Sequence, residues 1–243
     1  MKLALRTTFA CLMVLAARTA FADFAAVGTS KDNTLYLDGS GGISNGAGVY
    51  LFAGQAGSPR RGLLAFDVAS AVPAGATIQS VTLALHCSRT PSFAAPVACS
   101  LNRVLADWGE GASDAGDPGG TGAAAAPGDA TWIHTFFPGA LWITPGGDFD
   151  ATVSAAQTIG GVATYVWGST VQMVADVQGW LDTPATNYGW ILRGVESGDS
   201  NARRFDTKEN PVPENRPVLG IEYTTGLVGV ESSAWTAVKA LYR

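Results

Sequence analysis

The chain has 243 residues, of which 47% are hydrophobic and 14% are charged, and its formal charge is −5. An acidic chain is a poor candidate for binding nucleic acid or an anionic membrane, because neutralising phosphate groups requires clustered Lys and Arg. The length and apolar content suit one large domain with a single core better than two small domains.

Residues 1–22 have the features of a secretory signal peptide. Lys2 and Arg6 are basic, residues 7–17 are apolar but too short to span a bilayer, and "AFA" at 20–22 places small residues before a cleavage site after Ala22. Cleavage there removes three basic residues and no acidic one, so the formal charge falls from −5 to −8. We therefore expect an exported protein that does not span a membrane and that is extracellular, periplasmic or at the cell surface.

Two cysteines remain after this cleavage, Cys87 and Cys99. An even pair in an oxidising compartment favours a disulfide. The separation of twelve residues suits a link across a hairpin, and closing a loop of that size contributes about 3 kcal/mol in the chain-entropy description. No C-x-x-C spacing is present, and the chain has only two histidines, so we expect no metal or catalytic role for these thiols.

Short β-prone runs separated by Gly, Pro, Asp and Asn predict an all-β domain over residues 23–225. The predicted strands are 34–40, 49–54, 62–68, 76–87, 97–105, 131–137, 165–174, 190–197, 203–208 and 217–224. Within 76–87, apolar residues alternate along one face, which we expect to point inward. The run 97–105 is expected to return beside 76–87 and to bring Cys99 near Cys87.

Three segments depart from this strand pattern. Residues 109–130 contain seven glycines and little to bury, which predicts a mobile excursion rather than a binding surface. Apolar residues in the stretch 174–190 recur at three- and four-residue steps, which predicts a short helix that caps one end of the β-fold, with Trp180 as its anchor. Residues 226–243 form a C-terminal tail whose short amphipathic helix, from Ser232 or Ser233 onward, would dock on its own domain or on a partner.

Five segments, in this order, resemble the DNRLRE-domain family of secreted bacterial proteins. They are "RRGLLAFDVASAVPAGATIQSVTLAL" (60–85), "DWGEG" (107–111), "DATWIHTFF" with "WITPGGDFD" (129–150), "VADVQGWLDTPATNYGWIL" (174–192) and "RRFDTKENP" (203–211). The resemblance runs from about residue 32 to 224. It implies a non-catalytic, jelly-roll-like antiparallel β-sandwich. Some relatives are carbohydrate-binding modules, including ones for acidic polysaccharides such as alginate, and others belong to adhesins and surface proteins.

The residues give little support to catalysis. His86 and His134 both lie in predicted strands, and no serine stands in a G-x-S-x-G motif. Carboxylate pairs of the kind that glycosidases use are Asp107 with Glu110 and Asp148 with Asp150, but such spacings are common by chance in an acidic chain. Asp148 and Asp150 are also weak candidates to ligate a structural calcium ion, although no EF-hand spacing is present. We expect no catalytic residue and no other cofactor.

The predicted sugar site combines aromatic rings with planar or charged hydrogen-bonding groups. Its residues are Tyr188, Trp190, Arg193, Arg204 and Lys208. In the strand 203–208, alternation places Phe205 inward together with Arg203 and Thr207, because Phe205 is the only large apolar side chain. Arg204, Asp206 and Lys208 then face outward.

The leading hypothesis is an exported, non-catalytic module that binds carbohydrate or another cell-surface component, with an acidic polysaccharide as one ligand class. The alternative is a structural or adhesive surface protein without a sugar ligand, for which the C-terminal helix would be a docking element. A polysaccharide-degrading enzyme is the third hypothesis.

Overall fold

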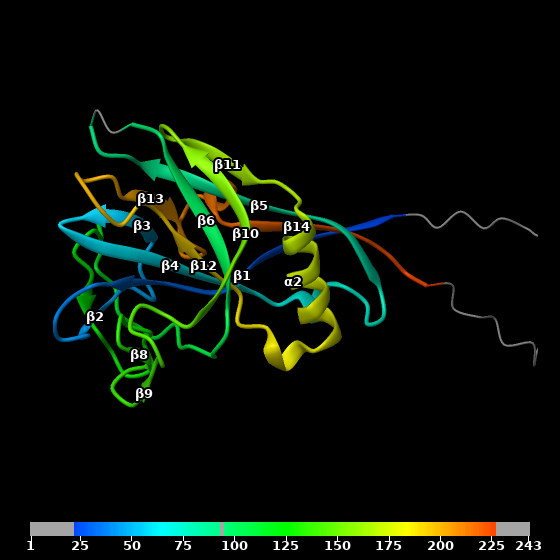
Figure 1. The fold of residues 1–243 in the computed structure, drawn as a ribbon, viewed down its shortest axis with the longest axis horizontal. Coiled ribbons are helices and arrows are strands. Elements are labelled where there is room, and N and C mark those ends of the chain that lie inside the picture. The colour runs from blue at the N-terminus through cyan, green and yellow to red at the C-terminus, as the bar shows by residue number, and fades with distance from the viewer. Residues whose placement is uncertain (1–21, 93–94, 227–243) are drawn as a thin grey trace, which may run out of the picture.

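A computed structural model describes residues 22–92 and 95–226, and these ranges form a mostly antiparallel β-structure (Figure 1). The all-β prediction is therefore confirmed, whereas the predicted leader and C-terminal helix lie outside the described residues. The strands are β1 (Asp23–Tyr36), β2 (Ile43–Ser44), β3 (Tyr50–Ala56), β4 (Ser58–Phe66), β5 (Thr77–Arg89), β6 (Val97–Val104), β7 (Ala123–Ala124), β8 (His134–Phe136), β9 (Ala140–Leu141), β10 (Phe149–Ile159), β11 (Ala163–Trp167), β12 (Trp190–Arg193), β13 (Arg203–Asp206) and β14 (Val218–Thr224). Among the described helices, none is long and apolar enough to cross a membrane.

Six strands close into a ring in the order β1, β14, β5, β13, β3 and β4, each hydrogen-bonded to the next and β4 to β1. β12, β6 and β10 continue outward from β4, and β11 pairs with β5. The first and last strands lie side by side, with Asp23 opposite Tyr223, so both ends of the described chain leave from one end of the molecule (Figure 1).

β4 and β12 are buried on both faces. Leu64 and Leu192 belong to the main core, whereas Leu63 and Ile191 pack into a second, smaller cluster with Trp108, Trp132 and Trp142. Because successive side chains of a strand point to opposite faces, two-sided burial requires an unbroken apolar run. The runs "GLLAF" and "WIL" have this character.

The predicted internal helix is present as α2 (Val171–Asp182). The Thr170 side chain caps it by accepting a hydrogen bond from the Met173 amide at 3.0 Å. Trp180 is buried against Trp190, with ring centroids 4.5 Å apart, and the helix packs on β5 and β10. The strand expected over 165–174 therefore ends at Trp167, because α2 begins four residues later. The short helices are α1 (Val68–Ala71), η1 (Pro184–Thr186) and η2 (Pro213–Asn215).

The hairpin expected to join Cys87 and Cys99 does not form. β5 pairs with β14, β13 and β11, whereas β6 pairs with β12 and β10, so the two cysteines lie on strands that are not neighbours in the sheet. Both thiols are free and buried. The expected disulfide is therefore absent from this structure, although both cysteines belong to the main core.

Candidate anion-binding pocket

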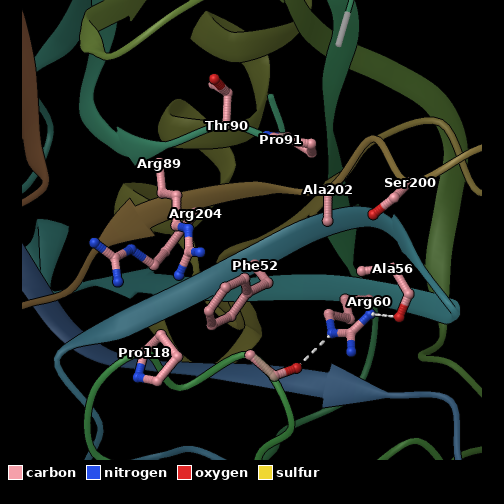
Figure 2. Close-up of a pocket in the computed structure, with 11 residues that line it drawn as sticks. Phe52, Ala56, Arg60, Arg89, Thr90, Pro91, Pro118, Ser200, Ala202 and Arg204 are labelled. Atoms are coloured by element: carbon pink, nitrogen blue, oxygen red, sulfur yellow. Dashed lines mark hydrogen bonds between the residues drawn. The ribbon is translucent and has the colours of Figure 1, made fainter. Parts of the chain in front are cut away.

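A pocket of about 260 Å³ opens where β3, β5 and β13 meet the long loop 109–130 (Figure 2). Its lining contains three arginines, Arg60, Arg89 and Arg204, and no acidic residue. The remaining walls come from Phe52, from Pro91 and Pro118 at the rim, and from small residues. In a chain of net negative charge, this local concentration of guanidinium groups creates a positive site that the overall field would not suggest.

Arg89 and Arg204 lie directly opposite each other on paired strands. The register shifts between them and the next pair, Cys87 with Phe205, so β5 has one extra residue, Ser88, against β13. Such a β-bulge re-aims the side chain that follows it, which explains how Arg89 reaches the same pocket as Arg204 although it lies two residues from the buried Cys87. Like charges placed opposite each other destabilise a sheet, and within the described residues Arg89 has no ion pair.

The guanidinium of Arg204 is held from two sides. It stacks on the ring of Tyr50 at 3.6 Å from the centroid, and its Nε donates to Ser88 Oγ at 3.1 Å. Nη1 forms an ion pair with Asp117 at 3.0 Å. A planar guanidinium fixed in this way presents its remaining donors in a fork that matches a carboxylate or sulfate group.

Arg60 forms part of the opposite wall and is nearly buried. Its guanidinium donates to the carbonyl oxygens of Gly120 at 2.9 Å, Ala56 at 2.6 Å and Ser58 at 2.9 Å; Figure 2 shows the first two. Burial lowers the pKa of Arg60 below its ordinary value. Arg60 therefore joins the β3–β4 turn to the loop through Nε and Nη1, and it contributes its charge to the pocket.

Phe52 supplies the apolar surface between these charges. It lies opposite Arg204 in the β3–β13 register, and Figure 2 shows its ring between Arg204 and Arg60. Its ring packs against Tyr36 with centroids 6.3 Å apart. Phe52 is only 7% exposed, so it adds a small apolar surface to the wall between the guanidinium groups rather than an open stacking face.

The loop 109–130, expected to be a mobile excursion, is anchored by hydrogen bonds, and its residues Pro118 and Gly120 line the pocket. The Gly119 carbonyl accepts from Tyr36 Oη at 2.9 Å, and the Ala115 amide donates to Asn45 Oδ1 at 2.8 Å. Further along, β7 pairs with β2. The sequence lacks apolar residues here because polar and backbone contacts, rather than core burial, hold the loop.

Arg204 is the only one of the five sugar-site residues predicted from sequence that lines this pocket. Trp190 is fully buried, and its Nε1 donates to Asp176 at 2.9 Å, so it is a core residue rather than a platform. Tyr188 is partly buried against the second core cluster, and its carbonyl accepts from Trp108 Nε1 at 2.9 Å. The run "WIL" of β12 is buried on both faces, so Trp190 lies in the core and not at the surface as expected.

The other two predicted residues are engaged elsewhere. Arg193 stacks on Phe149 at 4.6 Å from the ring centroid and lies 3.9 Å from Glu196, which also forms a two-pronged ion pair with Arg61. Burial lowers the pKa of Arg193, and the nearby Arg61 lowers it further. Arg193 thus belongs to a packed charge cluster on β12 rather than to the pocket.

Lys208 lies among carboxylates. Its Nζ is 3.0 Å from Glu110 Oε1 and also contacts Glu209, while its backbone amide donates to the buried Asp32 at 3.0 Å. Burial, followed by the charge of Glu209, raises the pKa of Asp32 well above its ordinary value, and burial also raises that of Glu110. Burial opposes the charged form of Lys208, but hydrogen bonds to both glutamates outweigh it and raise its pKa. Lys208 therefore belongs to a carboxylate cluster at the turn after β13 and not to the pocket.

Strand β13 follows the predicted alternation with one exception. Arg203, Phe205 and Thr207 are buried as expected, and Phe205 packs against Trp167 with centroids 6.0 Å apart. Asp206, expected to face solvent, is also buried, because its Oδ2 meets His86 Nδ1 at 2.6 Å.

The two weak calcium candidates, Asp148 and Asp150, form hydrogen bonds and an ion pair with other residues of the chain. Asp148 accepts hydrogen bonds from the amides of Ile143 and Thr144, each at 2.8 Å, and Asp150 accepts from the Thr152 amide at 2.9 Å and lies 3.4 Å from Arg103. In residues 22–92 and 95–226 no group of three or more His, Cys, Asp or Glu side chains is placed to hold a metal ion. Of the other carboxylate pair, Asp107 lies 2.7 Å from Lys31 and Glu110 contacts Lys208, so each has its own cationic partner.

No protein-family model matches the chain, and no curated protein was found to match it. The functional argument therefore depends on the pocket itself. Its defining features are two opposed arginines, one of them without an ion pair among the described residues, beside an aromatic ring.

Proposed function

We propose that this protein is an exported, non-catalytic module that binds an acidic polysaccharide through the pocket of Arg60, Arg89 and Arg204. The observation that carries the proposal is the cross-strand pair Arg89–Arg204, because an anionic group between them would remove the repulsion of two like charges. The adjacent Phe52, which is 7% exposed, adds a small apolar surface beside these charges.

The proposed fold is a jelly-roll-like β-sandwich, as the resemblance to the DNRLRE-domain family implies. Two strands support it because each changes partner along its length. β1 pairs with β14 over residues 23–28 and with β4 over 29–36, and β3 pairs first with β13 and then with β4. Strands that pass from one layer to another are typical of sandwiches whose sheets share strands at their corners.

Export is proposed from the sequence of residues 1–22, and it places the module where polysaccharides are found. The ligand would be bound mainly through its charge, and the protein would not catalyse a reaction on it. The pocket is small, so it would accommodate about one charged sugar unit of a longer chain.

Affinity electrophoresis in gels that contain alginate, polygalacturonate, glycol chitin or neutral dextran tests this function. We expect retardation by one of the two polyuronates, and at least about a tenfold loss of affinity in the double variant Arg89→Ala/Arg204→Ala, because charge-assisted hydrogen bonds each contribute about 1.5–3 kcal/mol. The double variant Arg103→Ala/Arg193→Ala is the matched control, since it removes the same two positive charges outside the pocket. If no glycan retards the protein, the proposed function is wrong and the structural or adhesive alternative is favoured. If the control variant loses as much affinity as the pocket variant, the glycan does not bind at this pocket.

A further inference from the structure

The ion pair between Asp117 and Arg204 has an unusual asymmetry. The Asp117 side chain is 74% exposed, whereas that of Arg204 is 13% exposed. Among the residues that the structure describes, the Asp117 carboxylate makes one polar contact, from Oδ1 to Nη1 at 3.0 Å, although a carboxylate has two oxygens and could bind the guanidinium fork with both. A carboxylate held by one exposed contact at the rim of a pocket is easily replaced.

Arg204 does not depend on Asp117 for its position. Tyr50 supports one face of the guanidinium, and Ser88 Oγ holds Nε. Pro118, the residue after Asp117, itself lines the pocket. The guanidinium is thus fixed with or without Asp117, and the loop places a carboxylate at the mouth of a site that we propose to bind acidic sugars.

We propose that Asp117 is an internal competitor, whose carboxylate occupies the position on Arg204 that a carboxylate of the bound sugar takes. This inference rests on the proposed function and deepens it, because it names the ligand group, a carboxylate, and the residue that sets the affinity. On binding, the sugar carboxylate replaces Asp117 at Nη1 and lies between Arg204 and Arg89.

The exchange requires movement of one side chain rather than opening of the loop. Hydrogen bonds from Ala115 to Asn45 and from Tyr36 to Gly119 hold the backbone on both sides of Asp117. The Asp117 side chain is largely surrounded by solvent, so it can rotate away from Arg204 while these contacts stay. The cost is that of an exposed ion pair, which is about 0–1 kcal/mol.

Titration calorimetry with galacturonate trisaccharides and alginate trisaccharides tests the competition. Asp117→Asn should tighten binding by up to about fivefold, because it weakens the competing ion pair that the ligand must replace. The matched control is Asp114→Asn, which removes the same charge from the same loop; Asp114 is exposed and contacts the Gly116 amide, not the pocket, and Asn retains that acceptor. Dextran sulfate serves as an anion without carboxylates.

Tighter trisaccharide binding in Asp117→Asn alone supports the inference, as does binding that appears only in this variant. Equal tightening in Asp114→Asn would overturn it, because the effect would then be one of general charge. Unchanged affinity in Asp117→Asn, with normal binding by the wild type, would overturn the competition and leave the proposed function standing. An equal gain for dextran sulfate would overturn the carboxylate assignment. No binding by either protein would refute the proposed function, and the inference with it.

Discussion

Replacing Arg203 by methionine should destabilise the protein far more than the same change at its neighbour Arg204. The Arg203 side chain is fully buried, and its guanidinium donates to the carbonyl oxygens of Ile159 at 3.3 Å, Asn201 at 2.7 Å and Ala95 at 2.6 Å. Within the described part of the chain these carbonyls are its hydrogen-bond partners, and no carboxylate pairs with it. One buried cation thus connects the end of β10, the segment before β13 and the segment before β6.

Methionine preserves much of the buried volume but leaves these carbonyls without their donor. At about 1 kcal/mol for each, the free energy of unfolding should fall by about 3 kcal/mol. For a domain of this size that corresponds to a drop in Tm of about 6–12 °C.

Urea denaturation followed by tryptophan fluorescence measures this difference as a lower midpoint with an unchanged slope. Arg204→Met is the matched control, with an expected loss below about 1 kcal/mol, because its ion pair is exposed on the Asp117 side. Equal losses in the two variants would refute the argument, as would a loss below about 1 kcal/mol for Arg203→Met.

Three further predictions concern buried polar groups. The pKa of Asp32 is raised in the fold, so the free energy of unfolding should fall as pH rises from about 4, the pKa of an unfolded aspartate, through the raised value. Asp32→Asn should make this fall smaller. The same dependence of the unfolding free energy on pH in the wild type and the variant, measured by urea denaturation, would contradict the prediction. Burial raises the pKa of Cys87 to about 11 and of Cys99 to about 12, so in protein lacking residues 1–22 Ellman's reagent should titrate both thiols at pH 8 only after denaturation. Rapid reaction in the native state would contradict this prediction, and absence of thiols after unfolding would restore the disulfide predicted from sequence. Asp176→Ala should lower stability by about 1–3 kcal/mol in thermal unfolding, because Trp190 Nε1 loses its acceptor; a Tm unchanged within about 1 °C would refute that reasoning.

Alternation and helical periodicity predicted much of the fold. The inward position of Phe205 and the outward position of Arg204 followed from period two alone, and α2 with its Trp180 anchor followed from helical spacing. β10 was not predicted, because "FDATVSAAQTI" is rich in small and polar residues. Its strand conformation is set by pairing with β6, which no local pattern reveals.

The candidate site was predictable only at Arg204. Arg89 points into the pocket because of a bulge in β5. Arg60 lines the pocket because its guanidinium binds the carbonyl of Gly120, which lies 60 residues further along the chain. Both placements depend on tertiary contacts that no local sequence pattern reveals. Trp190 was misassigned because an aromatic ring beside a turn is as compatible with a core as with a surface. The run "WIL" contains no polar residue, which is typical of a strand that is buried on both faces. This pattern could have placed Trp190 in the core.

The central claim is that an acidic sugar binds between Arg89 and Arg204. Its most direct test is NMR observation of arginine Nε–H resonances during titration with galacturonate and alginate trisaccharides. We predict shifts for Arg89 and Arg204 that saturate with the ligand, while Arg61 and Arg193, which lie in the cluster around Glu196, stay unchanged. Shifts confined to Arg61 and Arg193, or no shift at any arginine at saturating trisaccharide, would contradict the account.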